Sequence, residues 1–454
     1  MEKVLIVDTV CSKSGIINKD VNGGLGTRTK IGSSFRAQIL EHIKKQGVVL
    51  PLIELAYISA ILKSRSYSVD YLQIASNSQQ QLLLKQIDRS NYEHIIFFPA
   101  LVSYSYDLEL AQLIKKQFPA ITLGAIGPFV SACSDKVLSF FDWIIAGEVE
   151  PVLIKTPLHE LKALVTNSEW LNNLDELPFP DWSLFQGHNY SYRPMLTKVP
   201  FFTMQGSRGC PMSCSFYCPY PASQGTRWRT RSVASLVDEI DHLQTHYNAR
   251  SILFRDPFFS LKKDRTVQFA EALLENKIKI QWACETGLKT MDKELLKLLF
   301  QSGLRSINIG IESEDDEILK LNKRKQASKS TQTELIDCCH QLGIKVNAFF
   351  ILGLTGDTEE SIKKTIAYAK SLKTYAVQFT INTPLPGTPY YEEMRPQLIE
   401  QNLEKFDNNT LVFNHPNLSK DQLEHLKEQA FLAYYFRPRF LLEQLRWKIR
   451  ELSL

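Results

Sequence analysis

Short apolar runs alternate with amphipathic stretches over the first 150 residues of the chain. The runs of strand length are residues 4–7, 68–74, 95–100, 121–126 and 143–146. Helical spacing of apolar residues predicts helices near residues 51–63, 78–88, 108–118 and 132–140. Because strands that alternate with helices favour a parallel sheet covered by helices, we expect a five-stranded, doubly wound (Rossmann-like) α/β domain over residues 1–150.

The same alternation returns in the second half of the chain, after an interruption. Residues 151–198 contain Pro151, Pro157, Pro178, Pro180 and Pro194, and we expect a linker there. Further apolar runs at residues 201–204, 251–254, 279–283, 306–310, 346–352 and 377–381 are each separated by a helical pattern. Six such units predict a partial (β/α)6 TIM-like barrel over residues 199–390.

Residues 391–454 are expected to form a helical C-terminal region. From residue 418 onward, apolar residues at helical spacing are mixed with arginines, including Arg437, Arg439, Arg446 and Arg450. Such a basic amphipathic segment either covers the barrel or contacts an anionic surface, and we favour the first interpretation.

Composition adds few constraints. The chain has 454 residues, of which 44% are hydrophobic and 22% charged, and 53 basic against 49 acidic residues give a net charge of +4. This balance does not call for a nucleic-acid partner. The apolar runs are shorter than the roughly 18 residues of a membrane helix, and no cleavable signal pattern follows the first strand. We therefore expect a cytoplasmic protein without a transmembrane segment.

Three cysteines fall within nine residues of one loop: Cys210, Cys214 and Cys218. The loop follows the expected strand at 201–204, so it lies at the carboxyl end of a strand, where barrel enzymes carry their chemistry. A structural zinc site takes four protein ligands, whereas a 4Fe–4S cluster held by three thiolates keeps one iron open. A zinc loop, a disulfide or chance clustering are the alternatives.

This loop resembles that of the radical S-adenosylmethionine (SAM) superfamily, whose mark is Cys-x-x-x-Cys followed by an aromatic-Cys pair, here Tyr217-Cys218. It departs from the pattern in having three residues, not two, between Cys214 and Cys218. The resemblance implies a 4Fe–4S cluster on the three cysteines, and SAM that binds the open iron and yields a 5'-deoxyadenosyl radical. It also implies an external electron donor such as flavodoxin or ferredoxin.

Polar residues recur at the ends of the expected barrel strands. The resemblance implies that SAM is contacted by residues of these strand ends and of the cysteine loop, namely Tyr217, Asp256, Glu285, Glu312, Ser313, Arg324 and Gly353. Arg324 aligns with an arginine that pairs with the SAM carboxylate in the family. As alternatives, Glu312 is a helix N-terminal acid and Gly353 an ordinary turn residue.

A doubly wound domain ahead of such a barrel resembles the cobalamin-binding subgroup of the superfamily. The resemblance rests on residues 22–30, 51–57, 127–130 and 147–150. It implies cobalamin contacts at Thr27, Arg28, Ser103, Gly127, Pro128, Phe129, Gly147 and Glu148. The Asp-x-His-x-x-Gly signature is absent, so cobalt ligation by histidine is not expected. A nucleotide-binding domain or an empty sheet remain as alternatives.

These features predict a cobalamin-dependent radical SAM methyltransferase that acts on a non-nucleophilic carbon of a small-molecule or natural-product-type substrate. SAM alone methylates nucleophiles, and a saturated carbon is not one. A radical cyclase or rearrangement enzyme without methyl transfer is the alternative, followed by a non-catalytic cobalamin or iron–sulfur sensor. A tRNA-modifying methylthiotransferase-like enzyme is disfavoured, because the chain lacks an appended basic RNA-binding domain. No catalytic acid, base or hydrogen donor is assigned; Tyr217, Tyr220 and Tyr390 are candidates by position only.

Overall fold

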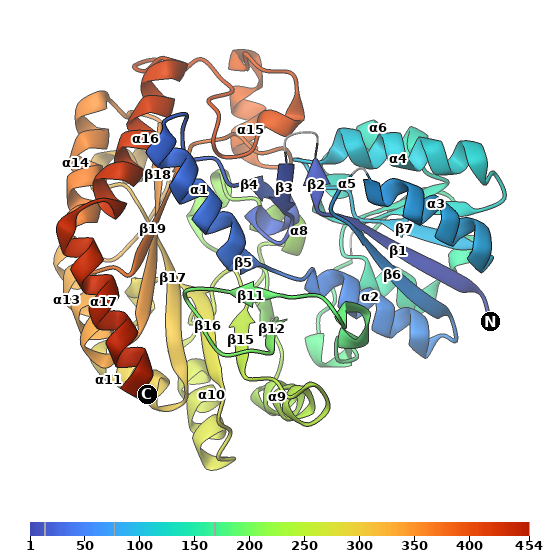
Figure 1. Cartoon of the computed structure of the whole chain (residues 1–454), viewed down its shortest axis with the longest axis horizontal. Coiled ribbons are helices and arrows are strands. Elements are labelled where there is room, and N and C mark those ends of the chain that lie inside the picture. The colour runs from blue at the N-terminus through green and yellow to red at the C-terminus, as the bar shows by residue number, and fades with distance from the viewer. Residues whose placement is uncertain (13–14, 77, 168, 454) are drawn as a thin grey trace.

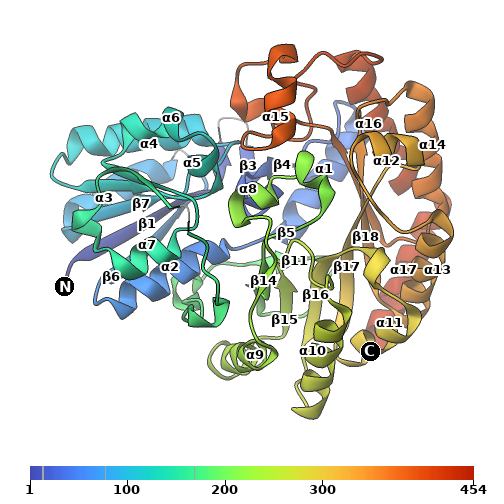
Figure 2. The same cartoon turned by 180° about the vertical axis from the view of Figure 1, so that it is seen from behind.

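Two six-stranded parallel sheets form the framework of the chain (Figure 1). The computed structural model describes residues 1–12, 15–76, 78–167 and 169–453. Seen from behind, the first sheet and its helices lie beside the larger second sheet, with short strands and loops between them (Figure 2). The α/β class and the arrangement of a doubly wound sheet followed by a partial barrel are confirmed.

The first sheet has the strand order β10-β9-β8-β7-β1-β6. Its strands are β1 (Lys3–Thr9), β6 (Ser68–Ile74), β7 (His94–Phe97), β8 (Thr122–Ala125), β9 (Trp143–Ala146) and β10 (Ala163–Thr166). All neighbours pair in parallel. β7 is buried at every position, which explains why its sequence reads as a continuous apolar run.

Helices cover both faces of this sheet (Figure 1). They are α2 (Ile53–Ser64), α3 (Ser78–Ser90), α4 (Tyr104–Gln117), α5 (Pro128–Ala132), α6 (Ser134–Val137) and α7 (Glu150–Lys155). The expectation of five strands is wrong by one, because β10 lies inside the stretch expected to be a linker. Three of its four residues are exposed, so it carries no buried apolar pattern that would mark it in the sequence.

The second sheet keeps its strands in chain order, all parallel, as a partial barrel. They are β12 (Phe201–Met204), β15 (Ser251–Phe254), β16 (Gln281–Thr286), β17 (Leu304–Glu312), β18 (Lys345–Leu352) and β19 (Ala376–Ile381). Its main outer helices are α9 (Val233–Tyr247), α10 (Lys263–Glu275), α11 (Lys293–Gln301), α13 (Lys329–Leu342), α14 (Glu359–Ser371) and α16 (Lys420–Tyr435).

Local sequence signals set the ends of several barrel helices. The Ser232 side chain accepts the hydrogen bond of the Ser235 N–H at the start of α9, and Thr358 and Ser419 begin α14 and α16 with capping boxes. α13 ends at Gly343, whose φ of 94° is the left-handed conformation that glycine adopts without strain. α16 contacts β19 and α14, so this part of the C-terminal region covers the barrel.

Smaller elements complete the chain. The short helices of the barrel and C-terminal region are α8 (Tyr220–Gln224), α12 (Asp316–Leu321) and α15 (Pro389–Met394), and α17 (Pro438–Ser453) is the last helix. The described residues also form three small antiparallel sheets. In the first, β3 (Gly15–Asn18) pairs with β2 (Cys11–Ser12) and with β4 (Thr27–Arg28). The others pair β5 (Val48–Val49) with β11 (Ser191–Tyr192), and β13 (Ser207–Arg208) with β14 (Arg229–Thr230). Within the described residues, no helix is both long and apolar enough to cross a membrane.

One N-terminal segment leaves the first sheet and packs on the barrel side of the molecule. It contains α1 (Phe35–Gly47), which contacts α16 (Figure 1). Lys44 of α1 donates hydrogen bonds to the Val377 carbonyl and to Gln378 Oε1, and its ammonium lies over the rings of Phe431 and Tyr435. The sequence analysis did not predict this helix. The segment ties the two sheets together through residues far apart in the chain.

Candidate active site at the barrel mouth

The cysteine loop starts where β13 ends and runs to α8. Gly209 begins it at a φ of 83°, and a side chain there would collide with the Arg227 carbonyl. The Cys210 N–H donates to the Gly225 carbonyl at 3.1 Å, and the Cys218 N–H to the Cys214 carbonyl at 3.0 Å. The loop is therefore folded by its own backbone hydrogen bonds and presents three thiols from one short segment.

The three thiols influence one another electrostatically. Burial raises the pKa of the Cys210 and Cys218 thiols, and the neighbouring Cys214 adds to both shifts. Arg324 Nη1 lies 3.4 Å from Cys214 Sγ, so a guanidinium stands directly beside the cysteine loop. The additional residue between Cys214 and Cys218 is accommodated by the 3-10 turn Ser213–Phe216.

This donor set fits an iron–sulfur cluster better than a single ion. Thiolates are the ligands that such clusters use, and each cluster thiolate binds a different iron. Among the described residues, no group of three His, Cys, Asp or Glu side chains is arranged to hold a single metal ion.

Arg324 joins the cysteine loop to the end of β17. Its Nη2 lies 3.2 Å from Glu312 Oε1 and donates to the Gly310 carbonyl at 2.8 Å. Burial raises the pKa of the Glu312 carboxyl, while the Arg324 guanidinium opposes that shift. Arg324 Nε is buried and has no hydrogen-bond partner. One carboxylate and one guanidinium with a spare donor thus stand beside Cys214, the pair of charges that an amino-acid zwitterion needs.

Space for a ligand lies next to this ion pair. A cavity of about 40 Å³ is bordered by the ends of β16 and β17 and by the segment after α12. Its lining includes Phe258, Gly287, residues 309–311 and residues 324–327. Gly310 has no room for a side chain, because a Cβ there would meet Glu312 and Arg324. The cavity therefore depends on a glycine at the strand end.

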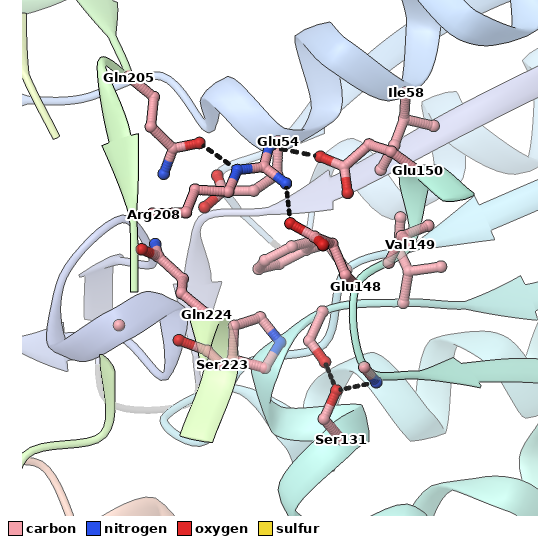
Figure 3. A pocket seen from close by; sticks show the side chains of 16 residues that line it. Glu54, Ile58, Ser131, Glu148, Val149, Glu150, Gln205, Arg208, Ser223 and Gln224 are labelled. Atoms are coloured by element: carbon pink, nitrogen blue, oxygen red, sulfur yellow. Dashed lines mark hydrogen bonds and ion pairs between the residues drawn. The ribbon is translucent and has the colours of Figure 1, made fainter. Parts of the chain in front are cut away.

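A second cavity of about 60 Å³ lies between the first domain and the barrel (Figure 3). Arg208 crosses this boundary: its Nη1 and Nη2 lie 2.6 Å from Glu148 Oε1 and Glu150 Oε1. Its Nε donates to Gln205 Oε1 at 2.7 Å, and Arg229 reaches Glu148 at 2.9 Å. Although burial favours the neutral acid, the Arg208 guanidinium holds the pKa of the Glu150 carboxyl below its usual value.

The first-domain wall of this interdomain cavity is built from loops at the carboxyl edge of the sheet. Gly127 and Gly147 have φ values of 113° and 102°, and side chains would meet the Phe98 ring and the Asn167 carbonyl. Glu54 of α2 also lines the cavity, and its Oε2 is buried without a hydrogen-bond partner. Burial raises the pKa of this carboxyl. Small residues and unpaired polar atoms at a sheet's carboxyl edge are typical of a ligand site.

A further buried cluster of charged residues lies near the cysteine loop. Arg255, at the end of β15, contacts Glu285 and the Asp20 carbonyl, and its Nε lies 2.8 Å from Asp20 Oδ2. The hydroxyl of Tyr220, two residues after Cys218, lies 3.4 Å from Glu285 Oε2. Burial raises the pKa of the Asp20 carboxyl to about 8, although Arg255 opposes the shift.

The structure brings several predicted site residues together. Cys214, Glu312 and Arg324 form one contact network, and the buried Tyr217 hydroxyl, which has no hydrogen-bond partner, feels the charges of all three. The residues of the predicted cobalamin site that line the interdomain cavity are Gly127, Pro128, Gly147 and Glu148.

Other predicted barrel residues have structural partners instead. Asp256 accepts hydrogen bonds from the Gly206 N–H and the Ser207 hydroxyl. Glu285 pairs with Arg255. Ser313 accepts from the Asp315 N–H, and Gly353 packs against Leu423.

Four predicted cobalamin contacts lie away from the interdomain cavity. Thr27 and Arg28 bind the C-terminal region, at the Asp407 carbonyl and at Glu404. The Ser103 hydroxyl donates to Asp107 at 2.7 Å, and Phe129 is buried against Tyr104. A loop position in the sequence does not say which way its side chain turns, so these four had no distinguishing signal.

Two further residues of the cavity walls, Gln205 and Arg208, were not predicted from the sequence. Gln205 and Arg208 stand between β12 and Cys210, and this position directly before the cysteine loop was the available signal. Glu54 lies in residues 51–57, one of the runs on which the cobalamin resemblance rests, but it was not named as a contact.

The chain is similar to a known protein family and to several known proteins. Residues 204–369 match the model of the radical SAM superfamily. An uncharacterized methyltransferase of Pyrococcus horikoshii is 28% identical over 277 residues, which are 61% of this chain and 59% of the relative. The anaerobic magnesium-protoporphyrin IX monomethyl ester cyclase of Cereibacter sphaeroides is 28% identical over 252 residues, 54% of this chain and 40% of the cyclase. The chain thus spans less than two thirds of both relatives.

Among solved structures, the radical SAM methyltransferase TsrM from Kitasatospora setae, with cobalamin and a 4Fe–4S cluster bound, superposes with a TM-score of 0.63. The match covers 87% of this chain and 78% of TsrM at 15% identity, so it establishes a shared fold. The superfamily uses a 4Fe–4S cluster and SAM. The match over residues 204–369, which include the three-cysteine loop at a barrel strand end, shows that this chain carries a radical SAM domain.

Proposed function

We propose that the chain is a cobalamin-dependent radical SAM methyltransferase that acts on a carbon that is not a nucleophile. The observation that carries the proposal is the network of Cys214, Arg324 and Glu312, which sets a guanidinium and a carboxylate beside a cluster-type thiol loop. The second support is the interdomain cavity, which stands where a parallel sheet binds ligands.

At the barrel mouth, Cys210, Cys214 and Cys218 would hold the cluster as thiolates. Arg324 would pair with the SAM carboxylate and Glu312 with its ammonium group, so that the sulfonium is oriented toward the loop. The buried Tyr217 hydroxyl has no partner in its surroundings and is available to hydrogen-bond a ligand there. When bound, the cluster supplies the electron that cleaves SAM and cobalamin supplies the methyl group.

Cobalamin fits the interdomain cavity by the chemistry of its walls. Gly127 and Gly147 let backbone approach a flat ligand closely, and Pro128 adds an apolar surface. The corrin carries amide side chains, which the unpaired Glu54 carboxyl and the Gln205 and Gln224 amides can hydrogen-bond. TsrM, which shares the fold, is a methyltransferase with cobalamin bound, and this favours the same ligand here.

A small-molecule substrate would enter between the two cavities, near the cluster of Arg255, Asp20 and Glu285. An electron donor of the flavodoxin or ferredoxin class would reduce the cluster. A radical cyclase is the second candidate, because relatives of similar identity include the magnesium-protoporphyrin cyclase.

The test is anaerobic turnover with methyl-labelled SAM, cobalamin, a reductant and candidate substrates. A methyltransferase yields labelled product together with 5'-deoxyadenosine and S-adenosylhomocysteine. A Cys218→Ala variant should lose cluster iron and both products, whereas Cys338→Ala, which removes a buried thiol of α13, should keep them. Deoxyadenosine with unlabelled product would favour the cyclase, and retention of the cluster in Cys218→Ala would contradict the assignment of the loop.

A further inference from the structure

The last helix carries apolar side chains that the protein leaves in solvent. Leu441, Leu442, Leu445 and Ile449 of α17 are between 57% and 63% exposed. Single exposed leucines are common on protein surfaces, but several on one helix mark an interaction surface. We therefore expect a binding partner to cover this face of α17.

The charged residues around these four side chains indicate the chemistry of that partner. At about 100° per residue the four side chains fall on one face of α17, with Arg439 and Arg446 along one border and Lys448 along the other. The opposite face is attached to the barrel, where Trp447 is buried against Tyr375 and His340. An apolar stripe bordered by cations on both sides is the pattern of a helix that lies in a membrane interface.

The segment from Arg437 to Arg450 is strongly cationic. It contains five basic residues, Arg437, Arg439, Arg446, Lys448 and Arg450, against the single acid Glu443. The Glu443 carboxyl is turned toward the protein, with a side-chain exposure of 12%, and pairs with Arg439 at 2.8 Å. The chain as a whole has a net charge of only +4, so positive charge is concentrated here.

A second apolar stripe lies on the same side of the molecule. Phe35, Ile39 and Ile43 of α1 are exposed at a spacing of four residues, on one face of that helix. Arg36 stacks over Phe436, the residue that follows α16, at 5.9 Å from the ring centroid, and this connects α1 to the start of the α17 segment. Both α1 and α17 lie toward the viewer in Figure 1 and behind the barrel in Figure 2.

We propose that the α1 and α17 stripes, the residues Phe35, Ile39, Ile43, Leu441, Leu442, Leu445 and Ile449, are a docking surface for an anionic lipid bilayer. Insertion of the apolar residues among the acyl chains covers the exposed carbon, and the arginines and lysine at the borders meet lipid phosphates. A second copy of the chain would bring two cationic borders together, which charge repulsion opposes. Attachment of this kind is peripheral and does not depend on the radical chemistry.

The experiment is co-sedimentation of the full chain with vesicles. Vesicles of phosphatidylcholine with about 30% phosphatidylglycerol should bind the protein, pure phosphatidylcholine should not, and about 0.5 M salt should weaken the binding. Leu442→Glu should lower the bound fraction on anionic vesicles about tenfold, because a carboxylate enters the apolar stripe and is repelled by the lipid charge. Arg446→Gln combined with Lys448→Gln should also weaken binding.

Leu82→Glu is the matched control. Leu82 lies on α3 of the first domain and is 61% exposed, against 60% for Leu442, so both changes add the same charge to an exposed helix position. Leu82→Glu should bind vesicles as the unchanged chain does, and circular dichroism should show both variants folded. The proposal fails if the unchanged chain does not bind anionic vesicles, or if Leu442→Glu binds equally well. Light scattering that shows a dimer lost in Leu442→Glu, without vesicle binding, would assign the surface to a second copy.

Discussion

At the scale of single residues, Arg324 performs two tasks. It contacts Cys214 Sγ and Glu312 Oε1, so it links the thiol loop to the strand end that would receive SAM. The two terminal nitrogens of the planar guanidinium contact the sulfur of Cys214 and the carboxyl of Glu312 at the same time. The single ammonium group of a lysine cannot reproduce that geometry.

Arg324→Lys should therefore weaken SAM binding about tenfold or more, since one charge-assisted hydrogen bond contributes about 1.5–3 kcal/mol, while cluster iron is retained. Equilibrium dialysis of labelled SAM against the reconstituted protein measures the SAM affinity, and iron analysis measures the cluster content. Arg305→Lys is the control. Arg305 lies over the ring of Phe300, so the same substitution there should leave the SAM affinity unaltered. Equal affinities for Arg324→Lys and the unchanged chain would contradict the role.

Asp20 gives a pH prediction. Its pKa is about 8 in the folded chain because of burial, against 3.8 without it, so between these values the folded state holds a proton that the unfolded state has lost. The free energy of unfolding should fall as the pH rises through this window, by about 1 kcal/mol per pH unit from this group. Above pH 8 the contribution is constant.

Urea unfolding at pH 6, 7 and 8 checks this expectation for Asp20. Asp20→Asn cannot ionise, so its stability relative to the unchanged chain should increase with pH across the window. A difference between the two proteins that does not vary with pH would show that Asp20 ionises normally. Asp241→Asn, a change at a residue of α9 outside the buried cluster, serves as the control.

At the scale of elements, a buried ion network joins β13 and β14 to the loop before α7. Arg208 meets both Glu148 and Glu150 at 2.6 Å, and all three side chains are buried. Removal of the Arg208 cation leaves Glu150 without its partner, while Glu148 keeps Arg229, and an uncompensated buried charge costs about 3–5 kcal/mol.

Arg208→Met should lower the free energy of unfolding by about that amount, as measured by urea unfolding. The double change of Arg208→Met and Glu150→Gln should recover part of the loss, because Glu148 keeps Arg229 as its partner and no uncompensated charge remains. Arg250→Met, at an exposed position before β15, should change stability little. A stable Arg208→Met variant would mean that water reaches the network.

The elements that could be predicted from the sequence share one property. Strands such as β9, β12 and β15 were predicted at their observed bounds, because buried strands are apolar runs between helical patterns. β10 and α1 were missed: β10 is an exposed edge strand, and α1 has only Ala37 and Leu40 fully buried. A segment held by contacts far along the chain leaves little periodicity in its own sequence.

The residues of the candidate site also fall into those that could be predicted from the sequence and those that could not. The cysteine loop, Glu312 and Arg324 were each predicted from a local motif, whereas the contact between Glu312 and Arg324 was not predicted. The interdomain cavity is built from Glu54, Glu150, Arg208 and Gln224, which meet only when the two domains pack. Gly127, Pro128, Gly147 and Glu148 of its wall were predicted from loops of the first sheet, but no spacing within the chain indicates that Arg208 and Gln224 meet them.

At the scale of the whole molecule, the interdomain cavity has walls from both parts of the chain. Loops of the first sheet border it on one side and Gln205, Arg208 and Gln224 on the other, so a ligand there would contact both parts. The Arg208 network and the Arg255 cluster hold the first domain against the barrel at that place. Ligand uptake is thus coupled to the contact between the domains.

Hydrogen–deuterium exchange of the full chain, with and without aquacobalamin, tests whether a ligand in this cavity contacts both parts. Bound cobalamin should slow exchange at α5, at α7 and in α8, because these segments border the interdomain cavity and would close on the ligand. The outer helix α10 lies away from the cavity and should exchange at the same rate in both samples, which makes it the internal control. Protection of α5 alone would place the ligand on the first domain without closure, and unchanged exchange at all three segments would remove cobalamin from this cavity.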